Sequence, residues 1–129
     1  MPAPMGDEQR LWAVRGAVKA GANEAGAILE ATEALMRELM ARNGLAAEQI
    51  VSCLFTATDD LNAEFPAVAA RRLGLDSVPL LCTRELDVPG AMPSVIRVLV
   101  HYHAPVDHVP QHTYLGEARE LRTDLPSAG

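Results

Sequence analysis

The sequence predicts an α+β domain: a five-stranded mixed β-sheet with one long and one short helix on one face. Three observations favour this fold class. Short runs rich in β-branched residues alternate with two segments of helical periodicity, 129 residues leave room for one core, and 49% of them are apolar. A sheet covered on one face only has a second face to hide, so we expect a homo-oligomer.

The first strand and the long helix open the predicted domain. Residues 11–19 have a β-like pattern, and Gly21 and Asn23 supply a turn and a helix N-cap. The helix is expected over residues 24–43, where side chains recur at spacings of three and four on one face: Ile28, Ala31, Thr32, Leu35 and Leu39. Gly44 suits the left-handed position that follows the last turn.

The remaining elements alternate with turn signals. Residues 50–58 are rich in β-branched and aromatic side chains, and Pro66 and Gly74 bound a helix of about two turns. Three further strands are expected at residues 78–87, 94–103 and 112–121. Together with the first two, these strands make up the predicted sheet.

A single domain is expected to occupy most of the chain, between two short tails. Residues 1–10 are predicted to be a mobile N-terminal tail, residues 11–122 the domain, and residues 123–129 a flexible C-terminal tail. The first ten residues lack the basic and apolar regions of a secretory signal, and no apolar run is long enough to span a bilayer. We therefore expect a cytoplasmic protein.

Composition excludes several classes of site. The two cysteines, Cys53 and Cys82, are too few for a disulfide framework and lack zinc-binding spacing. A net charge of −6, with one Trp, two Tyr and two Phe, argues against a nucleic-acid surface. We expect a small-molecule partner, with no nucleic acid, membrane, metal or cofactor. If that molecule is an anion, a local cluster of arginines must attract it against the field of an acidic protein.

Charged residues interrupt three apolar runs. Arg15 lies within "WAVRGAV", Arg97 lies at the centre of "VIRVLV", and Glu85 lies within "LLCTRELDV". An unpaired guanidinium in a buried strand costs several kcal/mol, so it needs an anion. That anion is either an internal carboxylate, Glu85 or Asp87, or a bound ligand.

The number of charges favours a ligand without excluding the ion pair. Four arginines on strands or near element ends could converge on one site: Arg15, Arg71, Arg97 and Arg122. Glu85 is the only strand-centre carboxylate predicted to neutralise them, so a dianionic ligand would balance the set. The planar fork of arginine also suits carboxylates, which it binds through two hydrogen bonds.

The four histidines and Cys82 are weaker candidates. His101 and His103 have a spacing on one strand face that metals can use, but no third ligand is evident. His108 and His112 fall in or beside a loop, so both are predicted to be solvated. Cys82 has no neighbouring histidine to activate it, so a nucleophilic role is not expected.

Four segments in order resemble the monofunctional chorismate mutases of the trimeric pseudo-α/β-barrel class: "RGAV", "TATDDLNAEFPAVAAR", "VPLLCTRELDVPGAMPSVIRVL" and "TYLGEARELRTDL". The resemblance covers residues 12–125. It implies a homotrimer that closes a pseudo-α/β barrel, with active sites between neighbouring chains. The implied activity is an isomerase reaction, the cofactor-free Claisen rearrangement of chorismate to prephenate in the shikimate pathway of aromatic amino acid biosynthesis.

The resemblance also implies roles for individual residues. Arg15 and Tyr114 match residues that bind the carboxylate of the enolpyruvyl side chain, and Arg97 matches the donor to the ether oxygen of the breaking C–O bond. Glu85 and Cys82 match groups that hydrogen-bond the ring hydroxyl. On this basis Arg97, Glu85 and Arg15 are the expected catalytic residues.

The walls and rim of the pocket follow from the same resemblance. The matching wall positions are Phe65, Ala67, Leu80, Leu81 and Leu121, and the matching cations near the mouth and the C-terminal tail are Arg71 and Arg122. Val68 stands where the family often has lysine, and Leu81 stands where threonine is common. One cationic and one polar rim contact are therefore absent, and weaker substrate binding is expected.

Physical chemistry agrees with this assignment. A pericyclic rearrangement needs neither proton transfer nor a nucleophile, so conformational restriction and electrostatics are what a protein can supply. A preorganised donor such as Arg97 is worth about 3 to 4 kcal/mol in related settings. The alternative from another class is a non-catalytic trimeric module that binds a small carboxylate between chains.

Overall fold

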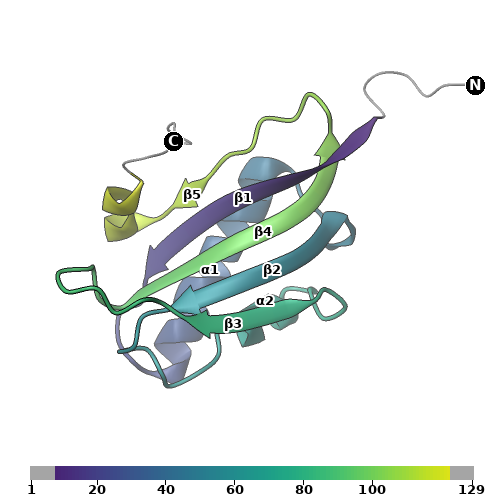
Figure 1. Ribbon diagram of the computed structural model, residues 1–129. Helices are drawn as coiled ribbons and strands as arrows, with labels where there is room; N and C mark the ends of the chain where they lie inside the picture. Colours follow the sequence, from purple (N-terminus) through teal and green to yellow (C-terminus); the bar gives the residue numbers. More distant parts are fainter. Residues whose placement is uncertain (1–7, 123–129) are drawn as a thin grey trace, which may run out of the picture.

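The computed structural model describes residues 8–122 (Figure 1). The predicted C-terminal tail, and the predicted N-terminal tail up to residue 7, lie outside the described residues. Within residues 8–122 the elements are β1 (Gln9–Lys19), α1 (Ala25–Asn43), η2 (Ala47–Gln49), β2 (Ile50–Ala57), α2 (Ala67–Arg72), β3 (Leu80–Arg84), β4 (Val95–Pro105), β5 (Thr113–Tyr114) and η3 (Gly116–Leu121). No helix in this part of the chain is both long and apolar enough to cross a membrane.

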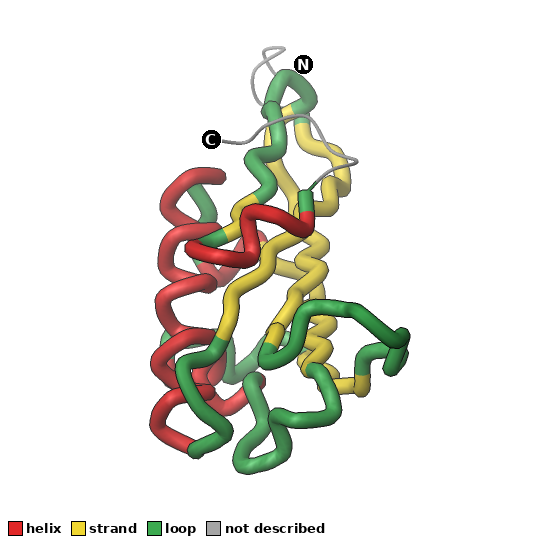
Figure 2. Tube along the Cα trace, turned by 90° about the vertical axis from the view of Figure 1, so that its left-hand side faces the viewer, coloured by secondary structure: helices red, strands yellow, loops and turns green. Residues whose placement is uncertain are grey.

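The five strands form one mixed sheet in the order β3-β2-β4-β1-β5. β4 is antiparallel to both β1 and β2, whereas β2 with β3 and β1 with β5 are parallel. Both α-helices lie on the same side of this sheet (Figures 1 and 2). The predicted α+β class and the one-sided helical layer are therefore confirmed.

The helix α1 ends as predicted but begins differently. Gly44 follows its last residue with a φ of 60°, the left-handed conformation that a glycine adopts without strain. The N-cap is Glu24, which makes no side-chain capping hydrogen bond. The predicted N-cap, Asn23, instead accepts the N–H groups of Asn62 and Ala63 through Oδ1, each at 3.0 Å. Asn23 thus ties the start of α1 to the loop before α2.

Two strands are shorter than predicted. β3 ends at Arg84, so Glu85 follows the strand and does not lie at its centre. The neighbouring strand sets this end, because β2 stops at Ala57, whose carbonyl accepts the Glu85 N–H at 3.0 Å. The predicted fifth strand is reduced to the two residues of β5, since Gly116, with a φ of 54°, turns the chain into η3.

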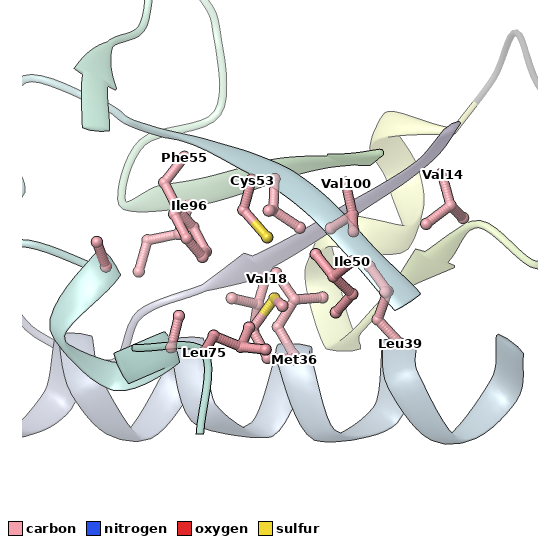
Figure 3. Packing of buried hydrophobic residues seen from close by; sticks show 14 of the residues in the cluster. Val14, Val18, Met36, Leu39, Ile50, Cys53, Phe55, Leu75, Ile96 and Val100 are labelled. Carbon is pink, nitrogen blue, oxygen red and sulfur yellow. The ribbon is translucent and has the colours of Figure 1, made fainter. Parts of the chain in front are cut away.

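The core lies between α1 and the sheet (Figure 3). The sheet contributes the even-numbered side chains of its two longest strands, among them Val14, Val18, Ile96, Val98, Val100 and Tyr102. They pack against one face of α1, where Leu35, Met36 and Leu39 are completely buried. Burying one such leucine contributes about 1.5 to 3 kcal/mol, so this interface fixes the strands that carry the site.

The sheet face opposite α1 and α2, here named the open face, carries the odd-numbered side chains of β1 and β4. Arg15, Arg97 and Leu99 lie on it, together with Leu54 of β2 and Leu81 of β3. Leu54 is 37% exposed and Leu81 is 64% exposed. The second face that the sequence predicts is thus present, and in the single chain much of it is apolar and uncovered.

Candidate active site

An arginine and a carboxylate form the centre of the open face. Arg97 lies in the middle of β4, and its Nε donates to Glu85 Oε1 at 3.1 Å. Thr56, the partner of Arg97 on β2, donates its hydroxyl to the other oxygen of Glu85. The internal ion pair that the sequence left open as one interpretation therefore exists. It uses Nε and does not involve the two Nη groups of Arg97, whose side chain is 39% exposed.

Arg15 and Tyr114 lie beside this pair on the same face. Ala17 of β1 is the partner of Arg97 on one side and of Tyr114 on the other, so the three side chains form one row across the sheet. Adjacent strands are about 4.8 Å apart, which puts the Arg97 and Tyr114 backbones about 10 Å apart. Arg15 lies two residues before Ala17 and points to the same face. Ala17 itself is completely buried.

The segment that follows Tyr114 covers one end of this row. Tyr114 is buried, and it packs with Ala17, Ala118 and Leu121, the last of which closes η3. Arg122 comes next and is the last described residue. We call Arg15, Glu85, Arg97 and Tyr114, with the Leu121–Arg122 segment, the arginine face.

A second set of candidate residues lies around α2 and β3. Cys82 is the β3 partner of Phe55, whose side chain fills the core, so Cys82 points to the helix side of the sheet. Burial raises the pKa of the Cys82 thiol, while a hydrogen bond with the Ala67 backbone and the charge of Arg71 oppose the rise. Cys82 is therefore close to both residues of α2 and stays protonated near neutral pH.

A cavity of about 380 Å³ opens next to this set, between the ends of β2 and β3 and residues 61–66. Phe65 and Cys82 line it, and an ion pair of Arg84 Nε with Asp59 Oδ1 at 2.9 Å borders it. Phe65 is 67% exposed at the cavity rim. We call Phe65, Ala67, Arg71, Leu80 and Cys82 the α2 edge.

The structure thus divides the predicted site residues between two places. The arginine face lies on the open side of the sheet, whereas Leu80, Cys82 and the α2 residues lie on the helix side at its β3 border. Leu81 stands between them: it belongs to β3 but points to the open face. Among the described residues, the cavity of about 380 Å³ is lined by Phe65 and Cys82 of the α2 edge and by no residue of the arginine face.

Residues not predicted from the sequence also contribute. Thr56 holds Glu85, and its position opposite Arg97 depends on a β2–β4 register that includes a bulge between Ile50 and Ser52. The loop histidines were wrongly predicted to be solvated. His108 Nε2 lies 2.8 Å from the hydroxyl of Tyr102, and His112 Nδ1 accepts the Arg15 N–H at 3.1 Å. No local sequence signal indicates the His112 contact, because it depends on how the chain before β5 flanks β1, whereas Tyr102 and His108 are only six residues apart.

His101 does not enter a metal site in the described part of the chain. Its Nδ1 lies 3.3 Å from Ser52 Oγ, a polar contact across β2 and β4. Among residues 8–122 no group of three or more His, Cys, Asp or Glu side chains is placed to hold a metal ion.

Arginine side chains such as Arg15 and Arg97 on one face can bind carboxylate groups through two parallel hydrogen bonds. The chorismate mutase type I family model matches residues 11–125. Chorismate mutase AroH of Thermus thermophilus is 44% identical over 118 residues, which are 89% of this chain and 96% of that protein. Chorismate mutase AroH of Bacillus subtilis strain 168 is 37% identical over 115 residues, 87% of this chain and 90% of that protein.

A solved structure agrees with the sequence relatives. A chorismate mutase from Clostridium thermocellum has a TM-score of 0.80 and 41% sequence identity, covering 84% of this chain and 98% of that chain. The chain belongs to the chorismate mutase type I family, as the sequence resemblance indicates. Its enzyme class is chorismate mutase, an isomerase of aromatic amino acid biosynthesis. None of these findings favours the non-catalytic binding module.

Proposed function

We propose that this chorismate mutase converts chorismate to prephenate in sites that each combine the arginine face of one chain with the α2 edge of a neighbour. The observation that carries this proposal is the division of the predicted residues between two sides of the sheet. Within a single chain Arg97 and Cys82 point to opposite sides of the sheet, so they do not face one small substrate together. They can do so if the open face of one chain meets the β3 border of another.

The uncovered open face supports a homotrimer as the assembly. Its leucines, with Leu54 and Leu81 each more than one-third exposed, are an apolar area of the kind that subunit contacts bury. A closed ring of three chains would use the open face and the β3 border of each chain once, and would leave neither exposed. A biosynthetic enzyme of this kind is expected in the cytoplasm.

The arginine face is suited to the charged part of the substrate. Arg15 and Tyr114 would bind the carboxylate of the enolpyruvyl side chain, and the binding energy of these contacts holds the flexible group over the ring, so the entropy cost of folding it is met when the substrate binds. Arg97 would donate an Nη hydrogen to the ether oxygen, where negative charge grows as the C–O bond breaks and the C–C bond forms. The rearrangement moves electrons within one molecule, so it needs no cofactor.

Glu85 and Cys82 would orient the ring through its hydroxyl. Glu85 accepts hydrogen bonds from Arg97 and Thr56, so its carboxylate is held in place before the substrate arrives. The raised pKa of Cys82 keeps its thiol neutral, which avoids a negative charge next to a dianionic substrate. Glu85 also offsets part of the arginine charge in the empty site.

The remaining predicted residues would form the walls and the rim. The proposed walls are Phe65, Ala67, Leu80, Leu81 and Leu121, and the proposed rim cations are Arg71 and Arg122. Val68 lies on the short helix α2 beside Ala67, and as a valine it adds no charge to this rim. We therefore expect substrate binding to depend strongly on Arg71.

The direct test is the disappearance of chorismate and the formation of prephenate with purified protein in EDTA. We expect turnover with the parent protein and a large loss of kcat with Arg97→Ala. Absence of turnover in the parent protein would refute the proposed reaction. Tight binding of chorismate by calorimetry without conversion would instead support the carboxylate-binding module.

A further inference from the structure

The strand β5 is very short for an element that carries a proposed substrate-binding residue. It has two residues, and it presents Tyr114 at the edge of the sheet. Beyond its pairing with β1, the Leu115 N–H donates to the Ala17 carbonyl at 2.9 Å. So short a ladder is marginal alone, because few hydrogen bonds offset the entropy of ordering it. Other groups must hold the chain just before Tyr114.

Asn43, the last residue of α1, holds Gln111, three residues before Tyr114. It is buried, and its Oδ1 accepts the Gln111 N–H at 2.8 Å while its Nδ2 donates to the Gln111 carbonyl at 3.1 Å. Nδ2 also donates to the Leu39 carbonyl at 2.8 Å. The amide side chain thus pairs with both backbone groups of Gln111, as a neighbouring strand would, and links them to the helix.

His112, the next residue, is held by a hydrogen bond with the backbone of Arg15, a predicted substrate-binding residue. The Arg15 N–H donates to His112 Nδ1 at 3.1 Å. The nearest backbone acceptor in line with β5 would be the Gln111 carbonyl, but this group already accepts from Asn43 and from the Thr113 hydroxyl at 3.0 Å. The imidazole therefore supplies the acceptor that the ladder lacks. A neutral ring that accepts at Nδ1 carries its proton at Nε2.

Gly16 of β1 allows the third residue, Thr113, to pack directly against the β1 backbone. Thr113 is its partner on β5, and a Cβ built on Gly16 would lie 3.0 Å from the Thr113 carbonyl oxygen. It would also lie 3.1 Å from side-chain atoms of Leu35 and Leu39. β5 therefore packs closely on the β1 backbone, and three consecutive residues, 111–113, are fixed immediately before Tyr114.

We infer that His112 is a positioning residue, assisted by Asn43, that holds Tyr114 beside Arg15 so that both can bind the substrate carboxylate. This inference rests on the carboxylate-binding role proposed for Arg15 and Tyr114. The carboxylate is present in both the ground state and the transition state, so misplacing its two ligands weakens both alike. The expected signature is a raised KM with little change in kcat, in contrast to the loss of kcat expected at Arg97.

The test compares two replacements of similar size. His112→Asn places Oδ1 where the imidazole has Nδ1, so it retains the acceptor, whereas His112→Leu removes it. We expect KM for chorismate to rise about tenfold in His112→Leu, the effect of one lost hydrogen bond, and to stay within about threefold of the parent in His112→Asn. Equal KM values in the parent and His112→Leu, or no rescue by His112→Asn, would overturn the inference.

A second measurement on the parent protein does not depend on the stability of any variant. Long-range nitrogen–hydrogen NMR spectra of the histidine rings report which ring nitrogen carries the proton. We expect His112 to be the Nε2–H tautomer at neutral pH. A proton on Nδ1 would contradict the hydrogen bond to Arg15.

Arg15→Ala separates this inference from the function on which it rests. If Arg15→Ala leaves KM unchanged, the carboxylate site is misassigned, whatever the NMR spectra show for His112. If Arg15→Ala raises KM but His112→Leu does not, only the positioning role fails. A raised KM in both variants, with rescue by His112→Asn, supports the two together.

Discussion

Arg97→Lys separates charge from geometry at the proposed donor to the ether oxygen. In the structure Arg97 Nε binds Glu85 at 3.1 Å, and the guanidinium has two Nη groups that can donate to a ligand at the same time. Lysine has three donors but only one nitrogen, on a shorter side chain, so that nitrogen cannot lie both at the Nε position beside Glu85 and at an Nη position beside the ether oxygen. Losing one preorganised donor costs about 3 kcal/mol, or roughly 100- to 1,000-fold in kcat.

The fold should tolerate this substitution. The side chains of Arg97 and Glu85 are 39% and 20% exposed, so their ion pair is screened by solvent and contributes at most about 1 kcal/mol to stability. The loss of kcat is therefore expected with a melting temperature only a few degrees below that of the parent protein. Initial rates of chorismate loss over a range of substrate concentrations, with thermal melting by circular dichroism, measure both quantities.

Arg37→Lys is the matched control. Arg37 also pairs with a glutamate, Glu33, through an Nη at 2.8 Å, but on the exposed surface of α1. The Arg37→Lys variant should keep the kcat of the parent protein. A kcat for Arg97→Lys within tenfold of the parent value would refute the argument that the fork geometry of Arg97 stabilises the transition state.

Three further outcomes are expected. Thr56→Val removes a donor to Glu85 and should lower kcat about tenfold, with recovery in Thr56→Ser; equal rates in both variants would contradict this role. Gly16→Ala should destabilise the fold by about 1 to 3 kcal/mol in urea, because its Cβ would lie 3.0 Å from a β5 carbonyl, whereas Gly26→Ala meets nothing within 4 Å and should not destabilise it. Burial lowers the pKa of His108 below its ordinary 6.5, and the charge of Asp107 raises it by a smaller amount. The unfolded chain therefore binds a proton at His108 more readily than the folded chain does. Stability should thus fall as pH drops below 6.5, and melting temperatures of His108→Gln should depend less on pH; an unchanged slope would count against the assignment.

Elements with strong local patterns were predictable from the sequence. The predicted helix over residues 24–43 matches α1 closely because apolar spacing and Gly44 define it locally. Residues 50–58 match β2 for the same reason, since a β-branched run ends in turn residues. The end of β3 was not predictable, because its pairing partner, Ala57 of β2, decides it. β5 is shorter than predicted because Gly116 turns the chain into η3.

The sequence names candidate site residues one by one, but it does not give their arrangement. The resemblance singles out Cys82 and Arg97, yet it does not say that they point to opposite sides of one sheet. The alternation of strand residues contains part of this information, since Leu81 and Cys82 are neighbours and must face opposite ways. His112 had no such signal, because its contact with Arg15 joins residues that are distant in sequence and meet only through the β1–β5 register.

Subunit complementation tests the shared site most directly. Arg97→Ala disables the arginine face, and Arg71→Glu places a repelling charge on the exposed surface of the α2 edge. Each variant alone should be nearly inactive. When the two chains are co-expressed and purified together, random assortment in a trimer should leave about a quarter of the sites with both contributing surfaces intact, and a similar share of the parent activity. A mixture no more active than either variant alone would contradict a site built from two chains.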